Sequence, residues 1–414
     1  MRPHPVEVAT IHALTWLAAS CAVGLLMALL LLVPELGAAL GPLTYGRWVP
    51  LHLDLALYGW TALPLVALLL RAYRPGERGA VMAVQAWSAS LLLGAAAWLS
   101  GETTGKPFLD WQGAARGAFL ASLLFLAGVL ASGLRGRTRA GASRAAVSGL
   151  AALWLLLLAV PASLSAATRP GTYPPVNPAT GGPTGASLLG STLGVIAIFA
   201  LAPLLLGLSG GGWRAAGETF GALAAHGALF AAVAAQGDRS HREPLQIAAV
   251  ATLLVWAWLL PRWLRRFDWP AGSRLWLLAF LGWGGALLAS AVPMFLPGLL
   301  DRIKFTNALV AHAHLAMAGM ATSFAALVLV VLNRGTRLAG VLDDRAGFVL
   351  WNAGNAVQVA TLVMAGALEA GDPGVVFRGD PSITVLYAVR ALAGAALLAA
   401  AARWLGRALR TEAA

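Results

Sequence analysis

Two histidines separated by one alanine stand inside an apolar segment of the chain. His312 and His314 lie in residues 307–333, NALVAHAHLAMAGMATSFAALVLVVLN, a stretch long enough to cross a bilayer as a helix. On an α-helix, residues two apart differ by about 200° in direction and about 3 Å in height, so the two imidazoles point to opposite faces at nearly one depth. A neutral imidazole binds metals well, and haem iron is the usual one in a membrane bundle. The pair therefore indicates one helix that ligates two groups. The plainer alternative is two polar core residues bonded to neighbouring helices, which is less common because ionisable groups inside a membrane are costly and usually functional.

The chain that must position this pair is strongly apolar. Of its 414 residues, 59% are hydrophobic and only 11% are charged, and a soluble domain carries about twice that charged fraction. A transmembrane helix needs about 20 apolar residues. We therefore expect an all-α polytopic membrane protein, with residues 1–414 forming a single integral membrane domain of twelve transmembrane helices. The first span is expected to be a retained helix and not a signal peptide. The expected spans are 9–34, 50–71, 79–99, 113–133, 145–167, 187–209, 216–236, 245–264, 273–296, 307–333, 346–370 and 382–409.

The basic residues indicate how these spans cross the membrane. The formal net charge is +12, but the lysines and arginines lie between hydrophobic spans, so lipid is the expected partner and nucleic acid is not. Most of them fall on the side that holds both termini, which predicts cytoplasmic termini. The single cysteine, Cys21, lies inside the first span and can form no intramolecular disulfide.

A third histidine matches the pair in depth. With this topology the second and tenth spans run in the same direction, and His52 lies near the outer end of the second, within about one turn of the depth of His312 and His314. His52 and one histidine of the pair could form a bis-imidazole clamp for a low-spin haem. Asp54 points away from His52 and either orients a ligand on another helix or snorkels outward. Arg390 lies at the level where the propionates of a haem would need a cation.

Other polar residues admit two interpretations each. His226 lies near the middle of the seventh span, and His241 lies in the charged loop after it. Asn352, Asn355 and Gln358 form one face of the eleventh span, which is either a set of interhelical hydrogen bonds or part of a hydrated proton route. The outer loop at residues 168–187, rich in Pro, Gly and Thr, is long enough to predict a functional lid.

Taken together, these residues resemble a known family. Twelve spans, a histidine at the outer end of the second and His-x-His on the tenth resemble subunit I of the haem-copper oxidase superfamily, and most closely its branch of C-type cytochrome oxidases and nitric oxide reductases. The resemblance runs from about residue 46 to about residue 405. Its motifs are ETTGKPFLDW after the third span, ALVAHAHLAMAG on the tenth and AVRALAG on the last. It implies that His52 and His314 ligate a low-spin haem b, and that His312 ligates a second, high-spin haem. It also implies a bacterial cytoplasmic (inner) membrane.

The sequence departs from the family where a second metal is expected. The family holds a copper or iron on one histidine of the sixth span and two of the seventh. Here the sixth span, SLLGSTLGVIAIFALAPLLLGL, has no histidine, and only His226 and His241 occur in and after the seventh. Three outcomes stay open: two haems without a second metal; a degenerate site built from His226, His241 or an oxygen ligand such as Glu218; or a bis-histidine electron carrier that has lost the second haem.

Two functions follow from these outcomes. The first is a haem b-containing membrane oxidoreductase subunit, which passes electrons through the low-spin haem to a high-spin haem that reduces O2 or NO. The alternative is a non-catalytic electron-relay or gas-sensing subunit of a respiratory complex. Since no CxxCH motif occurs, the electron donor is expected to be quinol or another respiratory subunit, such as a cytochrome c or a cupredoxin-like protein.

Overall fold

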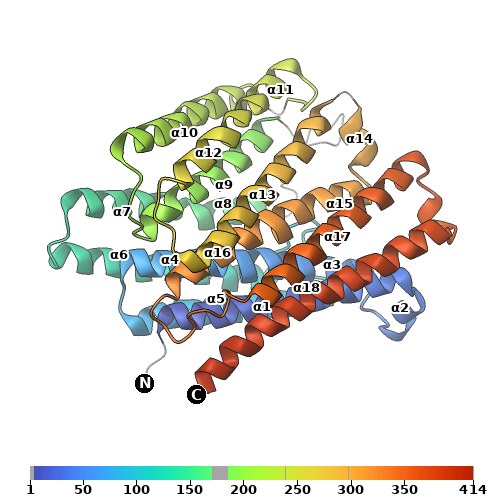
Figure 1. Ribbon diagram of the computed structural model, residues 1–414, viewed down its shortest axis with the longest axis horizontal. Coiled ribbons are helices and arrows are strands. Elements are labelled where there is room, and N and C mark those ends of the chain that lie inside the picture. Colours follow the sequence, from blue (N-terminus) through green and yellow to red (C-terminus); the bar gives the residue numbers. More distant parts are fainter. Residues whose placement is uncertain (1–3, 170–184, 238, 297, 414) are drawn as a thin grey trace.

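The computed structural model describes residues 4–169, 185–237, 239–296 and 298–413, and over these residues the chain is a bundle of long helices (Figure 1). The α-helices are α1 Pro5–Leu32, α2 Glu35–Ala39, α3 Tyr45–Asp54, α4 Ala62–Tyr73, α5 Glu77–Ser100, α6 Gly113–Arg139, α7 Arg144–Leu157, α8 Ala159–Ala167, α9 Gly185–Leu205, α10 Trp213–Ala234, α11 Pro244–Ala251, α12 Trp256–Leu264, α13 Arg274–Ala291, α14 Leu299–Ile303, α15 Asn307–His314, α16 Thr322–Leu332, α17 Arg345–Gly371 and α18 Pro381–Ala413. Two π-helical segments, η1 Leu55–Thr61 and η5 Leu315–Ala321, and four 3-10 segments, η2 Thr252–Val255, η3 Ala271–Ser273, η4 Val292–Phe295 and η6 Val375–Phe377, complete the helical structure.

The all-α membrane class predicted from the sequence is confirmed. Among the described residues, eleven helical spans are long and apolar enough to cross a membrane, so the chain is a multi-pass membrane protein. The remaining predicted span, the seventh at residues 216–236, corresponds to α10, a helix of 22 residues that packs on α9 and α12. It is not one of the eleven, because Glu218, His226 and many small residues lower its hydropathy.

Figure 1 shows the start of α1 and the end of α18 at the same end of the bundle. The assignment of that end to the cytoplasm stays a prediction. The first and last spans, α1 and α18, pack along each other. Of the predicted lid at residues 168–187, residues 170–184 lie outside the described part of the chain.

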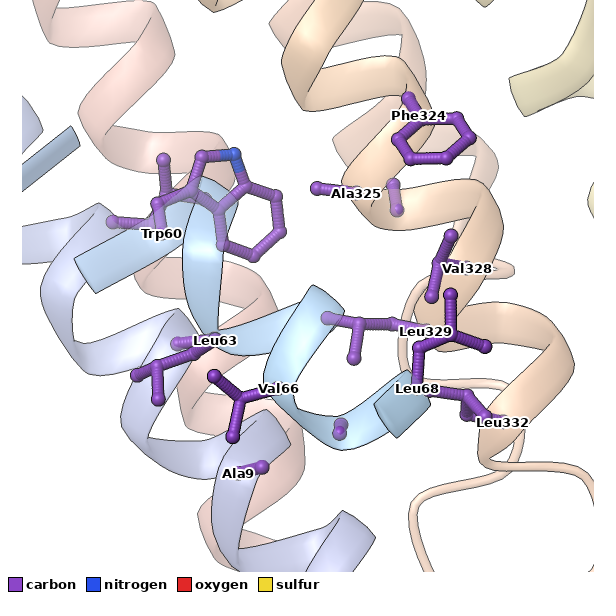
Figure 2. Packing of buried hydrophobic residues seen from close by; sticks show 14 of the residues in the cluster. Ala9, Trp60, Leu63, Val66, Leu68, Phe324, Ala325, Val328, Leu329 and Leu332 are labelled. Atoms are coloured by element: carbon purple, nitrogen blue, oxygen red, sulfur yellow. The ribbon is translucent and has the colours of Figure 1, made fainter. Parts of the chain in front are cut away.

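The largest core cluster joins helices from both ends of the sequence. Figure 2 shows apolar side chains of η1 and α4 lying against those of α16, with Ala9 of α1 beside them. Trp60, which is 1% exposed, adds a hydrogen bond from its indole Nε1 to Thr322 Oγ1 at 2.9 Å. This contact fixes the second span against the tenth, the two spans that carry the predicted haem ligands.

Both of these spans contain a seven-residue π-helical segment directly after their histidines: η1 follows α3, and η5 follows α15. A π-helical turn widens the helix and shifts its hydrogen bonds from the residue four places earlier to the one five places earlier. Thr322 Oγ1 donates to Met317 O, five residues back, at 2.9 Å, and Thr61 Oγ1 lies 2.6 Å from Leu57 O and 3.3 Å from Ala56 O, four and five residues back. Threonine hydroxyls therefore help to satisfy the carbonyls of both segments. Single π turns of this kind occur frequently at functional sites.

Candidate functional site

A cavity of about 1100 Å³ lies between the first, second, tenth and last two spans. Its wall includes His52 from α3 and His314 from α15. The structure therefore brings together the two histidines that were predicted to share one cofactor. Its volume lies slightly above the range of about 300 to 1000 Å³ that is usual for small-molecule and cofactor pockets.

The imidazole of His52 is held by α1. Its Nδ1 donates to the carbonyl oxygen of Ser20 at 2.9 Å, and Ser20 Oγ donates in turn to the carbonyl oxygen of His52 at 3.0 Å. The ring lies against the backbone at Gly24, where an added Cβ would come within 2.7 Å of His52 Cε1. Because Nδ1 carries the proton, Nε2 keeps its lone pair. This tautomer is the one that a metal ligand requires.

His314 also carries its proton on Nδ1, but its hydrogen-bond partner lies on its own helix. Its Nδ1 donates to the carbonyl oxygen of Val310, one turn earlier on the same helix, at 2.9 Å. His52, His314 and Arg390 lie close enough to interact electrostatically. The cavity wall therefore contains two imidazoles from two helices, each with an unprotonated Nε2, which is the type of donor that a bis-imidazole iron site requires.

His312 faces the other way, as predicted. It is not among the described residues that line the cavity. Its Nδ1 lies 2.8 Å from Ser290 Oγ of α13, and Ser290 Oγ donates its own hydrogen to Leu287 O at 2.8 Å. Ser290 must therefore accept from His312, so Nε2 of His312 is also left with its lone pair. The pair thus presents two possible ligands on two faces of one helix.

The surroundings of His52 and His312 are similar in two respects. Each histidine is bonded to a serine of a neighbouring helix, and each stands seven residues before a glycine of the π-helical segment, Gly59 or Gly319. A Cβ on Gly59 would lie 2.4 Å from Trp16 Cβ, and one on Gly319 would lie 2.8 Å from Trp283 Cδ2. A tryptophan of a neighbouring helix therefore packs directly on both π-helical segments.

Arg390 supplies positive charge to the cavity. It is 7% exposed and lines the cavity, and its Nη1 donates to Asn307 Oδ1 at 3.2 Å. Glu369 lies behind this contact and accepts the backbone N–H of Asn307 at 2.6 Å. No ion pair joins Arg390 to a carboxylate in the described residues, and its Nε has no hydrogen-bond partner. A buried cation of this kind is suited to an anionic group of a bound molecule.

The structure does not bring His226 and His241 together with this site. His226 Nδ1 donates to Ala222 O at 2.8 Å, and its ring lies 5.9 Å from that of Trp256, among the helices α9 to α12. His241 is 4% exposed in the loop after α10. Glu218, the oxygen ligand considered for a degenerate site, forms an ion pair with Arg262 at 3.5 Å. Across the described residues, no group of three or more His, Cys, Asp or Glu could hold a metal ion.

The remaining polar residues of the spans divide between packing and the cavity. Asp54 is fully buried, so the snorkelling interpretation is wrong for this residue. Asn352 accepts the indole N–H of Trp283 at 2.7 Å and so forms an interhelical bond. Gln358 lines the cavity, and its Oε1 has no partner. The polar face of the eleventh span therefore contributes both to helix packing and to the cavity wall.

Sequence reasoning missed the residues that hold the ligands in place. Ser20, Gly24, Asn307 and Glu369 act through contacts between spans far apart in the sequence. Asn307 had a local signal, because it follows Thr306, whose hydroxyl caps α15 by accepting from Ala308 N at 3.2 Å. Glu369 also had one, because it is an ionisable residue at the end of a predicted span. Ser20 and Gly24 carry no pattern that separates them from ordinary helix residues.

Comparison with known proteins finds similarity among solved structures. No family model matches the chain, and no curated protein matches it. A solved cryo-EM structure of a heme-copper terminal oxidase dimer is similar, at 13% identity, over 100% of this chain and 85% of that one, with a TM-score of 0.48. At that score and identity the similarity carries no weight for function, which must be judged from the site itself.

Proposed function

We propose that the cavity binds haem b between His52 and His314, and that the chain is an electron-carrying subunit of a membrane oxidoreductase related to subunit I of the haem-copper oxidases. The observation that carries this proposal is the shared tautomer: two imidazoles from two helices line one cavity of about 1100 Å³, and each has its Nδ1 hydrogen-bonded and its Nε2 unprotonated. Arg390 suits the propionates of the same group. Haem bound there would supply one-electron transfer.

The residues around the cavity have separate tasks in this proposal. Ser20 and Val310 fix the orientation of the two imidazoles through their carbonyl oxygens. Gly24 gives the His52 ring its place against α1. Asn307 holds Arg390 at the outer end of the cavity, and Glu369 holds Asn307. The chain thus binds and orients the group, while an outer donor or quinol delivers the electrons.

His312 distinguishes two versions of the function. In the first, its Nε2 ligates a second, high-spin haem that reduces O2 or NO, and the chain is an enzyme of the C-type oxidase or nitric oxide reductase branch. In the second, the chain is a relay or gas-sensing subunit of a respiratory complex in the bacterial inner membrane. The placement of His226 favours the second version, since it is the only histidine of the seventh span and its ring nitrogens contact the carbonyl oxygens of Ala222 and Thr252 beside Trp256.

The test is spectroscopy and metal analysis on protein purified from its native membrane. Two b haems, one of which binds CO, support the enzymatic version, and copper analysis then shows whether a second metal accompanies them. A single haem that is insensitive to CO supports the relay version. Protein that contains no haem contradicts both.

Variants assign the ligands. His52→Ala and His314→Ala are each expected to abolish the low-spin spectrum, whereas His312→Ala spares it and removes CO binding. His12→Ala is the matched control, because His12 is a membrane histidine bonded to Ser88 Oγ at 2.7 Å and lies outside the cavity wall. A low-spin spectrum that survives His52→Ala would refute the clamp.

The single cysteine offers an independent readout. Cys21 lines the cavity, so a bound haem is expected to slow its alkylation relative to haem-depleted protein. Cys21→Ser, which cannot be labelled, gives the background. Equal rates with and without haem would contradict binding in this cavity.

A further inference from the structure

Phe108 has a backbone conformation that is rare for an aromatic residue. Its φ is 66°, and the only other described non-glycine residue with positive φ is Arg74, which ends α4. The left-handed region is unfavourable for a bulky side chain, and such outliers persist where the surroundings enforce them, often at functional sites. Phe108 and its neighbour Pro107 line the cavity that His52 and His314 share.

The loop between α5 and α6 is braced around Phe108. Leu109 N donates to Lys106 O at 2.8 Å, and Thr104 Oγ1 donates to Leu109 O at 2.9 Å. Trp98 Nε1 donates to Asp110 O at 2.7 Å on the far side. These bonds close the loop locally, but they do not by themselves fix it to the cavity.

The link to the cavity is the hydroxyl of Tyr58, which donates to the carbonyl oxygen of Phe108 at 2.7 Å. Tyr58 belongs to η1 and stands six residues after His52. Its ring has edge-on contacts with Trp111 and Phe119, at centroid distances of 5.4 and 5.0 Å. Trp87 Nε1 donates to the carbonyl oxygen of Tyr58 at 2.8 Å. Because its surroundings are packed, Tyr58 is a fixed point on the span that carries His52.

We propose that Tyr58 is a positioning residue that holds Phe108 as a wall of the His52–His314 cavity and so keeps water from the redox group bound there. This inference rests on the proposed function. The oxidised form of a bis-imidazole iron carries one more positive charge than the reduced form, so excluding water favours reduction. Tyr58 and Phe108 would thereby influence the reduction potential of the low-spin haem without contacting its iron.

The test compares midpoint potentials of purified, haem-loaded variants. Tyr58→Phe removes only the hydroxyl. Its midpoint potential is expected to be about 59 mV more negative than that of wild type, which for one electron is a tenfold change in the oxidised-to-reduced ratio. Phe108→Gly is expected to give the same shift with unimpaired thermal stability, since glycine accepts positive φ without strain. Phe108→Tyr keeps the aromatic wall and should retain the wild-type potential.

A matched control separates the proposed positioning role of Tyr58 from a general effect on the thermal stability of the protein. Tyr73 is also buried, and its hydroxyl donates to the carbonyl oxygen of Leu150 at 2.6 Å, outside the cavity. Tyr73→Phe should lower thermal stability and leave the potential unchanged.

The proposal and the function on which it rests fail in different ways. Wild-type protein without haem overturns the proposed function. Haem-loaded Tyr58→Phe protein that keeps the wild-type potential overturns the role of Tyr58 alone. If Tyr58→Phe does not fold, a wild-type potential in Phe108→Gly still overturns the proposal, because Phe108 is then not the wall that excludes water.

Discussion

The ring of His52 rests on α1 because residue 24 has no side chain. Nothing about Gly24 in the sequence of the first span distinguishes it from other small residues, since its importance comes from a histidine that lies 28 positions later in the chain and touches it only in the folded state. Histidines could be identified from the sequence because an ionisable group in an apolar span is unusual by itself. Residues such as Gly24, which give the histidine rings their place, could not be identified in this way.

Gly24→Ala tests this contact. A Cβ at this position would lie 2.7 Å from His52 Cε1 and 3.0 Å from Nδ1, so the ring must move and the bond to Ser20 must lengthen. We expect a loss of low-spin haem, measured as the ratio of haem absorbance to protein. Gly128→Ala is the control, because nothing lies within 4 Å of a Cβ there. Normal haem content in Gly24→Ala would mean that the ring has room to shift.

At the scale of elements, the length of the apolar stretches predicted where the helices lie, but it did not predict the π-helical segments within them. Eleven of the twelve expected spans meet the apolar criterion, because a bilayer-spanning helix leaves a long continuous signal. The π-helical segments η1 and η5 leave none, since they depend on tryptophans from other helices that pack on Gly59 and Gly319. The proposed ligands His52 and His314 precede these segments, so the helix geometry beside the proposed site is the part that periodicity describes least well.

The junction of α17 with α18 gives a prediction of pH dependence. Asp344 caps α17 by accepting from Gly347 N at 3.2 Å, and Arg403 Nη2 donates to it at 3.0 Å. The hydrogen bond from Arg403 is the main cause that lowers the pKa of the Asp344 carboxyl. A carboxyl with a lowered folded-state pKa stabilises the fold above its unfolded pKa of about 3.9, and this stability is lost as the pH falls through the folded value.

Thermal melts in detergent from pH 7 to pH 3 would show this effect. On acidification below about pH 4, the free energy of unfolding of the wild-type protein should fall by on the order of 1 kcal/mol more than that of Asp344→Asn. The difference is small because Arg403 is half exposed. Glu77→Gln, an acidic residue of the first turn of α5 without an ion pair in the described residues, should melt like wild type. Parallel curves for wild type and Asp344→Asn would rule out the contribution of this pair.

Across the whole molecule, packing is concentrated around the cavity. In its most apolar stretch, the tenth span Asn307–Leu332 is 67% buried inside the protein, whereas the fifth span Arg144–Ala167 is 6% buried. Local opening is easiest where few buried contacts are lost. We expect amide hydrogen exchange in detergent to be faster in α7 and α8 than in α15 and α16, read peptide by peptide by mass spectrometry. Equal protection of the two spans would show that the bundle opens only as one unit.

The pairing of α1 with α18 has a consequence for biogenesis. Ser20 and Gly24 come from the first span, and Arg390 comes from the last, yet all three line one cavity. A ribosome that feeds this chain into a membrane would have delivered both histidines before the closing wall of their pocket existed. If a haem binds there as proposed, its cavity is complete only after α18 has packed, so insertion is expected into a nearly complete bundle and not a nascent one.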